Sequence, residues 1–308
     1  MPTNPHVQPM TLQQWSILVS LSIIWGSSFF FVEIIVKEIP PITLVALRVL
    51  LAAIILSLLL FIKKTPLTLN KTTIYIFSVM GLLNSVLPYV LIAWGQQYIS
   101  SGLAATLNAS TPIFSVIAAH FFTSDEKITT NKLTGVVIGF LGVVVMLSDS
   151  INESENLIIG KIAVILAAIC YATGAIFSKK ANHNNITPLQ TATGQMTASA
   201  IFLTPMAFVF ESPWTLSPPS LLTWGSMAGL VLFSSVLAYI LFFQLLTKTG
   251  ATNLLLVAFL IPVSSIALGV LFLNEILTTK HLLGMLCIGV GLTILDGRAT
   301  QALKKRLA

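Results

Sequence analysis

Charged side chains are scarce in this sequence: they make up 8% of its 308 residues, whereas a soluble domain carries about 25%. Hydrophobic residues make up 56%, which is more than a water-facing surface tolerates, so a soluble globular domain is excluded. Histidine occurs four times and cysteine twice. No two histidines have ligand spacing, and Cys170 and Cys287 lie inside apolar runs. The sequence therefore predicts no metal site, no cofactor and no disulfide framework.

The hydrophobic residues instead fall in long runs, each close to the roughly 20 residues that an α-helix needs to cross a bilayer. Backbone polar groups have no water partner in hydrocarbon, so such runs form helices. We therefore predict an all-α integral membrane protein with ten transmembrane helices. They lie at about 15–36, 42–62, 73–94, 102–122, 132–148, 160–178, 189–210, 222–244, 252–273 and 281–296.

The basic residues indicate how the chain crosses the bilayer. If the N-terminus is cytoplasmic, twelve Lys and Arg fall in cytoplasmic segments, three (Lys37, Lys161 and Lys280) fall on the other side, and Arg48 lies within a helix. This asymmetry follows the positive-inside rule and predicts that both termini are cytoplasmic. It also explains the net charge of +6 without a nucleic-acid partner. Residues 1–14 contain no Lys or Arg, so the first run is not a signal peptide.

The chain contains an internal repeat. Residues 12–150 align with residues 158–297, and the alignment places Pro112 on Pro262 and Glu126 on Glu275. We therefore predict two five-helix units, residues 1–150 and residues 151–308, the second ending in a basic tail. Because each unit has an odd number of helices, the second enters the membrane from the opposite side. Inverted repeats are typical of secondary transporters, which bind their solute where the repeats meet.

Several segments also resemble a known family. They are "WGSSFFF" in the first helix, "ALRVLLAA" in the second, and the paired segments "PIFSVIAAHFFTSDEKITTNKLTG" and "PVSSIALGVLFLNEILTTKHLLG". Together with the repeat, they resemble the EamA branch of the drug/metabolite transporter superfamily over essentially the whole chain. The resemblance implies a bacterial inner-membrane carrier of small metabolites, often an exporter of amino acids or related compounds. It also implies that helices 1, 3, 4, 6, 8 and 9 line a central cavity.

Four charged residues are candidates for a special role. Glu33 and Arg48 fall at similar depths in the first two helices, so they form either a structural ion pair or a transport site, in which Glu33 carries a proton or meets a substrate amine and Arg48 holds a substrate carboxylate. Glu126 and Glu275 each precede a Thr-Thr pair, with Thr130 and Thr279 as candidate N-caps of the helices that follow. We expect these two glutamates to fix the loops between the fourth and fifth helices of their repeats.

Neutral polar and aromatic residues complete the predicted site. The polar ones recur at helical spacing, and the resemblance places them in the cavity, where the bulky rings stack on or enclose a solute. The remaining predicted substrate-binding residues are Trp25, Ser85, Tyr89, Trp94, Asn108, Thr111, Tyr171, Tyr239 and Asn253. Pro112 and Pro262 each free a backbone carbonyl and permit a bend useful for gating. Helix-to-helix hydrogen bonding is the alternative role for any single Ser or Thr.

The sequence favours a carrier that moves a small polar or amphipathic solute by alternating access, and the resemblance implies that it is an exporter. No nucleotide-binding loop and no catalytic cluster are present, so neither ATP-driven pumping nor an enzyme is expected. Other readings stay open: an uncoupled facilitator, a transporter of S-adenosylmethionine, nucleosides or lipophilic drugs, a lipid flippase, or a repeat that transports nothing. The partners are the bilayer and the solute. A coupling proton and the choice between monomer and homodimer are left open.

Overall fold

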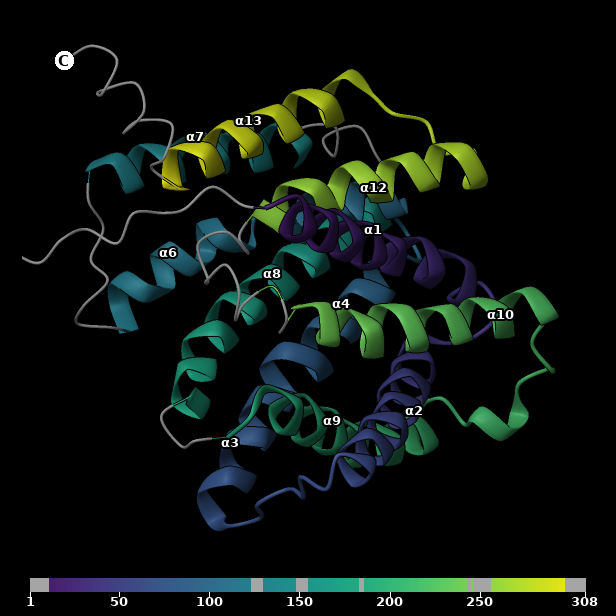
Figure 1. The fold of residues 1–308 in the computed structure, drawn as a ribbon. Coiled ribbons are helices and arrows are strands. Elements are labelled where there is room, and N and C mark those ends of the chain that lie inside the picture. Colours follow the sequence, from purple (N-terminus) through teal and green to yellow (C-terminus); the bar gives the residue numbers. More distant parts are fainter. Residues whose placement is uncertain are drawn as a thin grey trace, which may run out of the picture.

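The computed structural model describes residues 11–122, 130–147, 155–182, 186–242, 245 and 256–296, which form helices joined by short connections (Figure 1). In the first repeat, the third span is divided by a π-helical turn and the fourth is broken in two. Its helices are α1 (Leu12–Ile35), α2 (Pro41–Ile62), α3 (Lys71–Gly81), η1 (Leu82–Val86), α4 (Leu87–Gly95), α5 (Ser101–Asn108), α6 (Thr111–Phe122) and α7 (Thr130–Leu147).

The second repeat follows the same plan. The third span of this repeat, which is the eighth of the chain, also changes from α- to π-helix part-way along. Its helices are α8 (Glu155–Asn182), α9 (Pro188–Phe210), η3 (Pro213–Thr215), α10 (Leu221–Gly229), η4 (Leu230–Leu237), α12 (Leu256–Leu273) and α13 (Thr279–Asp296). Several starts are fixed by side-chain caps: Thr187 and Gln190 form a capping box at α9, and the Thr278 hydroxyl accepts from the His281 N–H at α13. The cap of α13 is therefore Thr278 and not the predicted Thr279.

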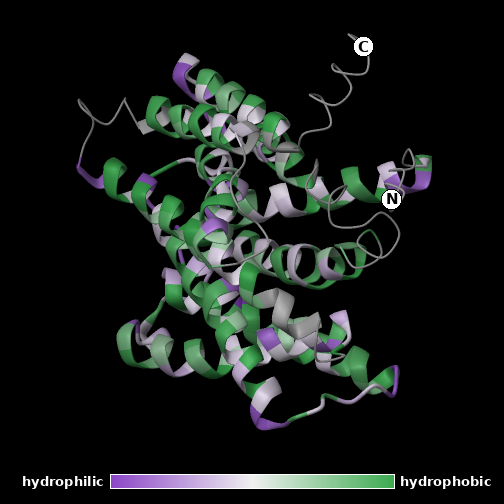
Figure 2. Ribbon diagram, turned by 90° about the vertical axis from the view of Figure 1, so that its left-hand side faces the viewer, coloured by the Kyte–Doolittle hydropathy of each residue, from purple (hydrophilic) through white to green (hydrophobic). Residues whose placement is uncertain are grey.

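Seven helical segments in the described residues are long and apolar enough to cross a membrane, and shorter apolar helices cover 133–145, 260–273 and 279–294. Figure 2 shows hydrophobic colouring along most helices and hydrophilic residues mainly near helix ends and connections. Large apolar side chains also face outward, such as Ile54 and Leu58 on α2 and Ile201 and Val209 on α9. Such an exposed apolar surface suits contact with lipid. The prediction of an all-helical membrane protein with about ten spans is confirmed.

The helices pack with the symmetry that the repeat predicts. Helix α2 packs on its repeat equivalent α9, α7 on α13, and α5 on α12. Other contacts occur in equivalent pairs: α3 packs on α8 as α10 packs on α1, and η1 packs on α9 as η4 packs on α2. In Figure 1, α7 and α13 run side by side at one edge of the molecule. Most contacts therefore join one repeat to the other, and the polar residues of both meet between them.

Glycines let the backbones of α7 and α13 approach closely. A Cβ added at Gly291 would lie 2.6 Å from the Gly135 carbonyl oxygen, and one added at Gly142 would lie 2.7 Å from the Gly284 carbonyl oxygen. The two contacts are equivalent, because Gly135 aligns with Gly284 and Gly142 with Gly291. Small residues at a helix crossing gain van der Waals contact, which is a main driving force inside a membrane. These glycines therefore pack within one chain.

The fourth span breaks where proline predicts it. Pro112 has no N–H, so the Asn108 carbonyl cannot accept the usual helical bond. The Thr111 hydroxyl donates to that carbonyl at 2.6 Å instead. Helix α5 ends at Asn108 and α6 begins at Thr111, and the span changes neighbours at this point: α5 packs on α1, α8 and α12, and α6 packs on α7 and α8. At the equivalent Pro262, α12 continues without a break.

Candidate functional site

The third span of each repeat carries a π-helical turn at an equivalent place. One turn contains Ser85 and the other Ser235, residues that align in the repeat, and both side chains are fully buried. A π-helical turn inserts an extra residue into the α-helix, which shifts the side chains on one face, and it often marks a functional site. The two turns therefore offer two equivalent buried hydroxyls between the repeats.

Arg48 lies beside one of these hydroxyls. Its Nε donates to Ser235 Oγ at 3.0 Å, and its guanidinium carbon lies 4.0 Å from the centre of the Tyr89 ring. The residue is buried, with 5% of its surface exposed. Among the residues that the structure describes, no carboxylate pairs with Arg48, and its Nη atoms have no hydrogen-bond acceptor. The Nη groups are therefore available to a further partner.

Gln195 occupies the equivalent position in the second repeat, and its contacts match those of Arg48. Its Nε2 donates to Ser85 Oγ at 2.8 Å and to the Tyr239 hydroxyl at 3.2 Å. Tyr239 is the equivalent of Tyr89. Each repeat thus contributes one hydrogen-bonding side chain that contacts the serine of the other repeat and the tyrosine of its own. We call each set a half-site: one consists of Arg48, Ser235 and Tyr89, and the other of Gln195, Ser85 and Tyr239. The two half-sites have the same geometry and differ in charge.

The two half-sites join into one group, the central polar cluster. Tyr89 and Tyr239 lie near each other, and the Tyr171 ring meets the Tyr89 ring edge-on at 6.4 Å. The cluster consists of Arg48, Ser85, Tyr89, Tyr171, Gln195, Ser235 and Tyr239. Five of these residues were predicted as site residues. Gln195 and Ser235 were not, although their repeat alignment with Arg48 and Ser85 is the signal that identifies them.

The structure does not bring Glu33 to Arg48, so the expected ion pair is wrong. Gln96 Nε2 donates instead to Glu33 Oε2 at 3.3 Å and to the Phe29 carbonyl at 2.9 Å. Glu33 is in the last turn of α1, and Gln96 follows α4. Both side chains lie towards the helix ends, while Arg48 points to the other repeat's π-helical turn. Depth alone suggested the pair, but the side chains face different neighbours.

The other predicted residues lie outside the central polar cluster. Trp25 packs against Phe242, with ring centres 5.7 Å apart, and Trp94 pairs with Tyr98 on an exposed surface. Asn108 and Thr111 stand at the break in the fourth span, and the Asn108 Oδ1 is buried without a hydrogen-bond donor. The predicted residues Asn253 and Glu126 are outside the described residues.

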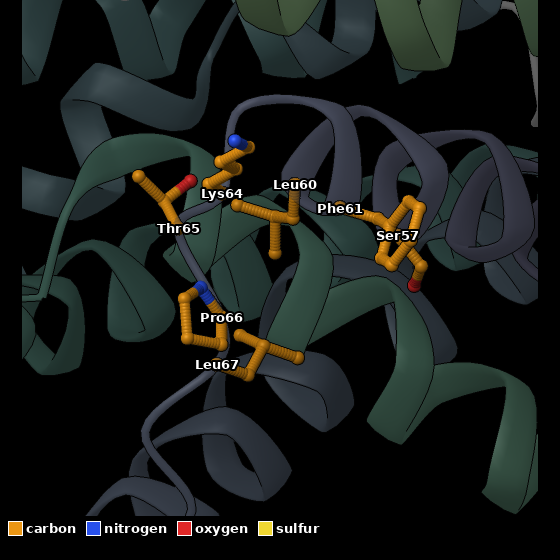
Figure 3. A pocket seen from close by; sticks show the side chains of 7 residues that line it. All are labelled: Ser57, Leu60, Phe61, Lys64, Thr65, Pro66 and Leu67. Carbon is orange, nitrogen blue, oxygen red and sulfur yellow. The ribbon is translucent and has the colours of Figure 1, made fainter.

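Two hollows lie on the outside of α2. Figure 3 shows one of them at the end of α2, where the side chains come from the last turns of the helix and the connection that follows. The lining residues are Ser57, Leu60, Phe61, Lys64, Thr65, Pro66 and Leu67. The second hollow lies along α2 and α9, and its lining includes Leu50 of α2 and Thr204 of α9. Neither lining contains a residue of the central polar cluster, so these hollows are features of the outer surface.

A family model identifies the chain. The model of the EamA-like transporter family matches it twice, at residues 14–148 and at residues 158–295. The chain belongs to the EamA-like transporter family. It is therefore a multi-pass membrane protein and a transporter, not an enzyme. The two matches also confirm that the chain is built from duplicated repeats.

Three relatives resemble this EamA-like transporter over most of its length. It is 25% identical to the uncharacterized transporter YoaV of Bacillus subtilis (strain 168), covering 89% of this chain and 94% of YoaV. It is 27% identical to an uncharacterized transporter of Archaeoglobus fulgidus, covering 92% of this chain and 98% of that transporter. It is 24% identical to the probable amino-acid metabolite efflux pump of Escherichia coli (strain K12), covering 88% of this chain and 91% of that pump. One crystal structure superposes with a TM-score of 0.65 at 15% identity, covering 92% of this chain and 97% of the other, and supports the fold.

Outside the central polar cluster, three glutamates of this EamA-like transporter join the repeats; we call these contacts the carboxylate clamps. Glu275 accepts from the Ser101 N–H at 2.8 Å, from the Ser101 hydroxyl at 2.6 Å and from the Gly102 N–H at 3.0 Å, which caps α5. Glu211 accepts from the Ile42 and Thr43 N–H groups at 2.9 and 2.6 Å, which caps α2. A carboxylate satisfies the free N–H groups of a helix start and suits its positive end.

The third clamp is Glu38, which accepts from the Ser220 N–H at 2.6 Å and the Ser220 hydroxyl at 2.8 Å just before α10. These hydrogen bonds, the backbone one foremost, hold the pKa of the Glu38 carboxyl below its ordinary value. The clamp is therefore present at neutral pH and is lost only as the pH falls through that lowered value. The clamps follow the first, seventh and ninth spans, so all three lie on the same side. Glu275 was predicted to fix its own loop; the helix start it contacts belongs to the other repeat.

The Glu275 clamp depends on a glycine, which gives a testable prediction. A Cβ added at Gly269 would collide with the Glu275 carboxylate. Gly269→Ala should therefore displace the cap of α5 and leave the protein about 1 kcal/mol less stable than its control, seen as a lower thermal midpoint in detergent. Gly225→Ala is the matched control, since nothing lies within 4 Å of a Cβ there and the gain in helix propensity is the same. Equal midpoints for the two variants would contradict this role of the clamp.

Proposed function

We propose that this protein exports a small metabolite, an amino acid or a related compound, across the bacterial inner membrane by alternating access, with both termini in the cytoplasm. The observation that carries the proposal is the central polar cluster. It lies between two duplicated repeats in a protein of a transporter family, where such carriers bind their solute. The name of the Escherichia coli relative, a probable amino-acid metabolite efflux pump, supports this choice of solute.

The chemistry of the cluster supports the same choice. It offers one cation, several neutral hydrogen-bonding groups and three tyrosine rings. A highly charged solute such as a phosphate ester would need more than one positive side chain to compensate its desolvation. A small solute with a single anionic group and an apolar or planar part matches these groups better. The duplicated geometry supplies two equivalent ways of closing around the solute, one for each side of the membrane.

Counterflow in proteoliposomes tests the proposal. Vesicles loaded in turn with neutral amino acids, nucleosides, S-adenosylmethionine or lipophilic cations are diluted into the same radiolabelled solute, with protein-free vesicles as control. Saturable exchange of amino acids is expected. Exchange confined to one of the other classes would replace the proposed solute, and exchange of none would contradict the proposed transport of small metabolites.

A further inference from the structure

The two half-sites of the central polar cluster are related by the repeat but carry different free groups. Beside Ser235, the Arg48 Nη atoms are donors without an acceptor among the described residues. Beside Ser85, Gln195 uses its amide nitrogen in both of its hydrogen bonds, and its Oε1 accepts none from the described residues. Both residues are buried, with 5% and 4% of their surfaces exposed. One half-site therefore presents a cation with free donors, and the other presents a neutral amide with a free oxygen.

The protein itself fixes these two groups in place. Arg48 is held by a hydrogen bond to the other repeat and by the face of Tyr89, and Gln195 is held by two hydrogen bonds. Tyr89 lies near Tyr239, so the two half-sites adjoin each other. A guanidinium with free Nη atoms binds a carboxylate with two parallel hydrogen bonds. An amide oxygen accepts from an ammonium group.

We propose that the cluster binds the zwitterionic form of an α-amino acid in one orientation, with its carboxylate on Arg48 and its ammonium group on Gln195 Oε1. This proposal rests on the proposed function. It adds which charged group of the solute each of the two side chains binds. Because the half-sites are geometrically equivalent, the arginine sets the orientation. Exchanging the two side chains should reverse the bound solute and still satisfy both of its charged ends.

The test is counterflow with L-threonine, L-leucine and L-phenylalanine, each compared with its carboxamide. The wild type should prefer the acids by roughly tenfold or more, since the amide leaves Arg48 without an anionic partner. Arg48→Gln should remove this preference, and the double variant Arg48→Gln/Gln195→Arg should restore it. Lys63→Gln, which removes an exposed charge after α2, is the control. Thermal unfolding in detergent shows whether each variant is folded.

The outcomes separate this inference from the proposed function. Exchange of amino acids with equal acceptance of the carboxamides, or with no change in Arg48→Gln, would contradict the zwitterion site and leave an amino-acid carrier. A folded double variant that fails to recover the preference would contradict the equivalence of the half-sites and overturn the proposal. Exchange of none of the three acids by the wild type would contradict the proposed solute and, with it, this site.

Discussion

Replacing Gly291 with alanine is expected to destabilise the protein by about 1–3 kcal/mol, the usual effect of overpacking. The added Cβ would lie 2.6 Å from the Gly135 carbonyl oxygen and 2.7 Å from the Gly139 nitrogen. Both are backbone atoms, so only a separation of α7 from α13 relieves the clash. That separation removes contacts along one of the most extensive helix interfaces between the repeats.

A glycine on the same helix provides the control. Nothing lies within 4 Å of a Cβ added at Gly289, so Gly289→Ala should be neutral or stabilise the protein by up to about 1 kcal/mol through helix propensity. The measurement is thermal unfolding of the two purified variants in detergent, together with the yield of monodisperse protein. A Gly291→Ala variant as stable as Gly289→Ala would show that α7 and α13 do not pack as described.

The second large effect concerns Glu33, which we predict to be the group that couples transport to protons. Glu33→Gln should reduce flux driven by a pH gradient by roughly tenfold or more and leave exchange at equal pH intact, because the amide cannot take up or release a proton. The neighbouring Gln96 is buried, and its Oε1 accepts no hydrogen bond. A protonated Glu33 would be a donor beside this acceptor, so the two protonation states differ in their contacts.

The measurement compares the two fluxes in the same proteoliposomes. Glu155→Gln is the control, since it removes an exposed carboxylate at the start of α8. Unchanged pH-driven flux in Glu33→Gln would remove Glu33 as the coupling site. A loss of both fluxes together would indicate that Glu33 supports the structure around Gln96 and has no separate role in coupling.

The sequence predicts the spans well because apolar runs and helix starts are local features. Helix α2 was expected at 42–62 and lies at Pro41–Ile62, and α9 was expected at 189–210 and lies at Pro188–Phe210. The break before Pro112 follows from the missing N–H of proline. The repeat also follows from the sequence, because equivalent residues recur in the same order.

The site is only partly readable from the sequence because its contacts join distant segments. Helical spacing placed Ser85 and Tyr89 on one face, but it does not show that Gln195 donates to Ser85 or that Arg48 lies over Tyr89. The π-helical turns change the spacing on which such arguments rest. Trp94 was expected to face the solute, yet ring type alone does not tell an inward side chain from one at the surface.

A perfectly duplicated carrier would spend equal time facing either compartment. The carboxylate clamps make the two faces of this protein unequal, because all three lie on the side that the positive-inside rule assigns to the exterior. An opening on that side would have to break these contacts between each carboxylate and the helix start that it caps. We therefore expect the solute-free protein to favour the conformation that is closed on the side of the clamps, as the proposed export requires.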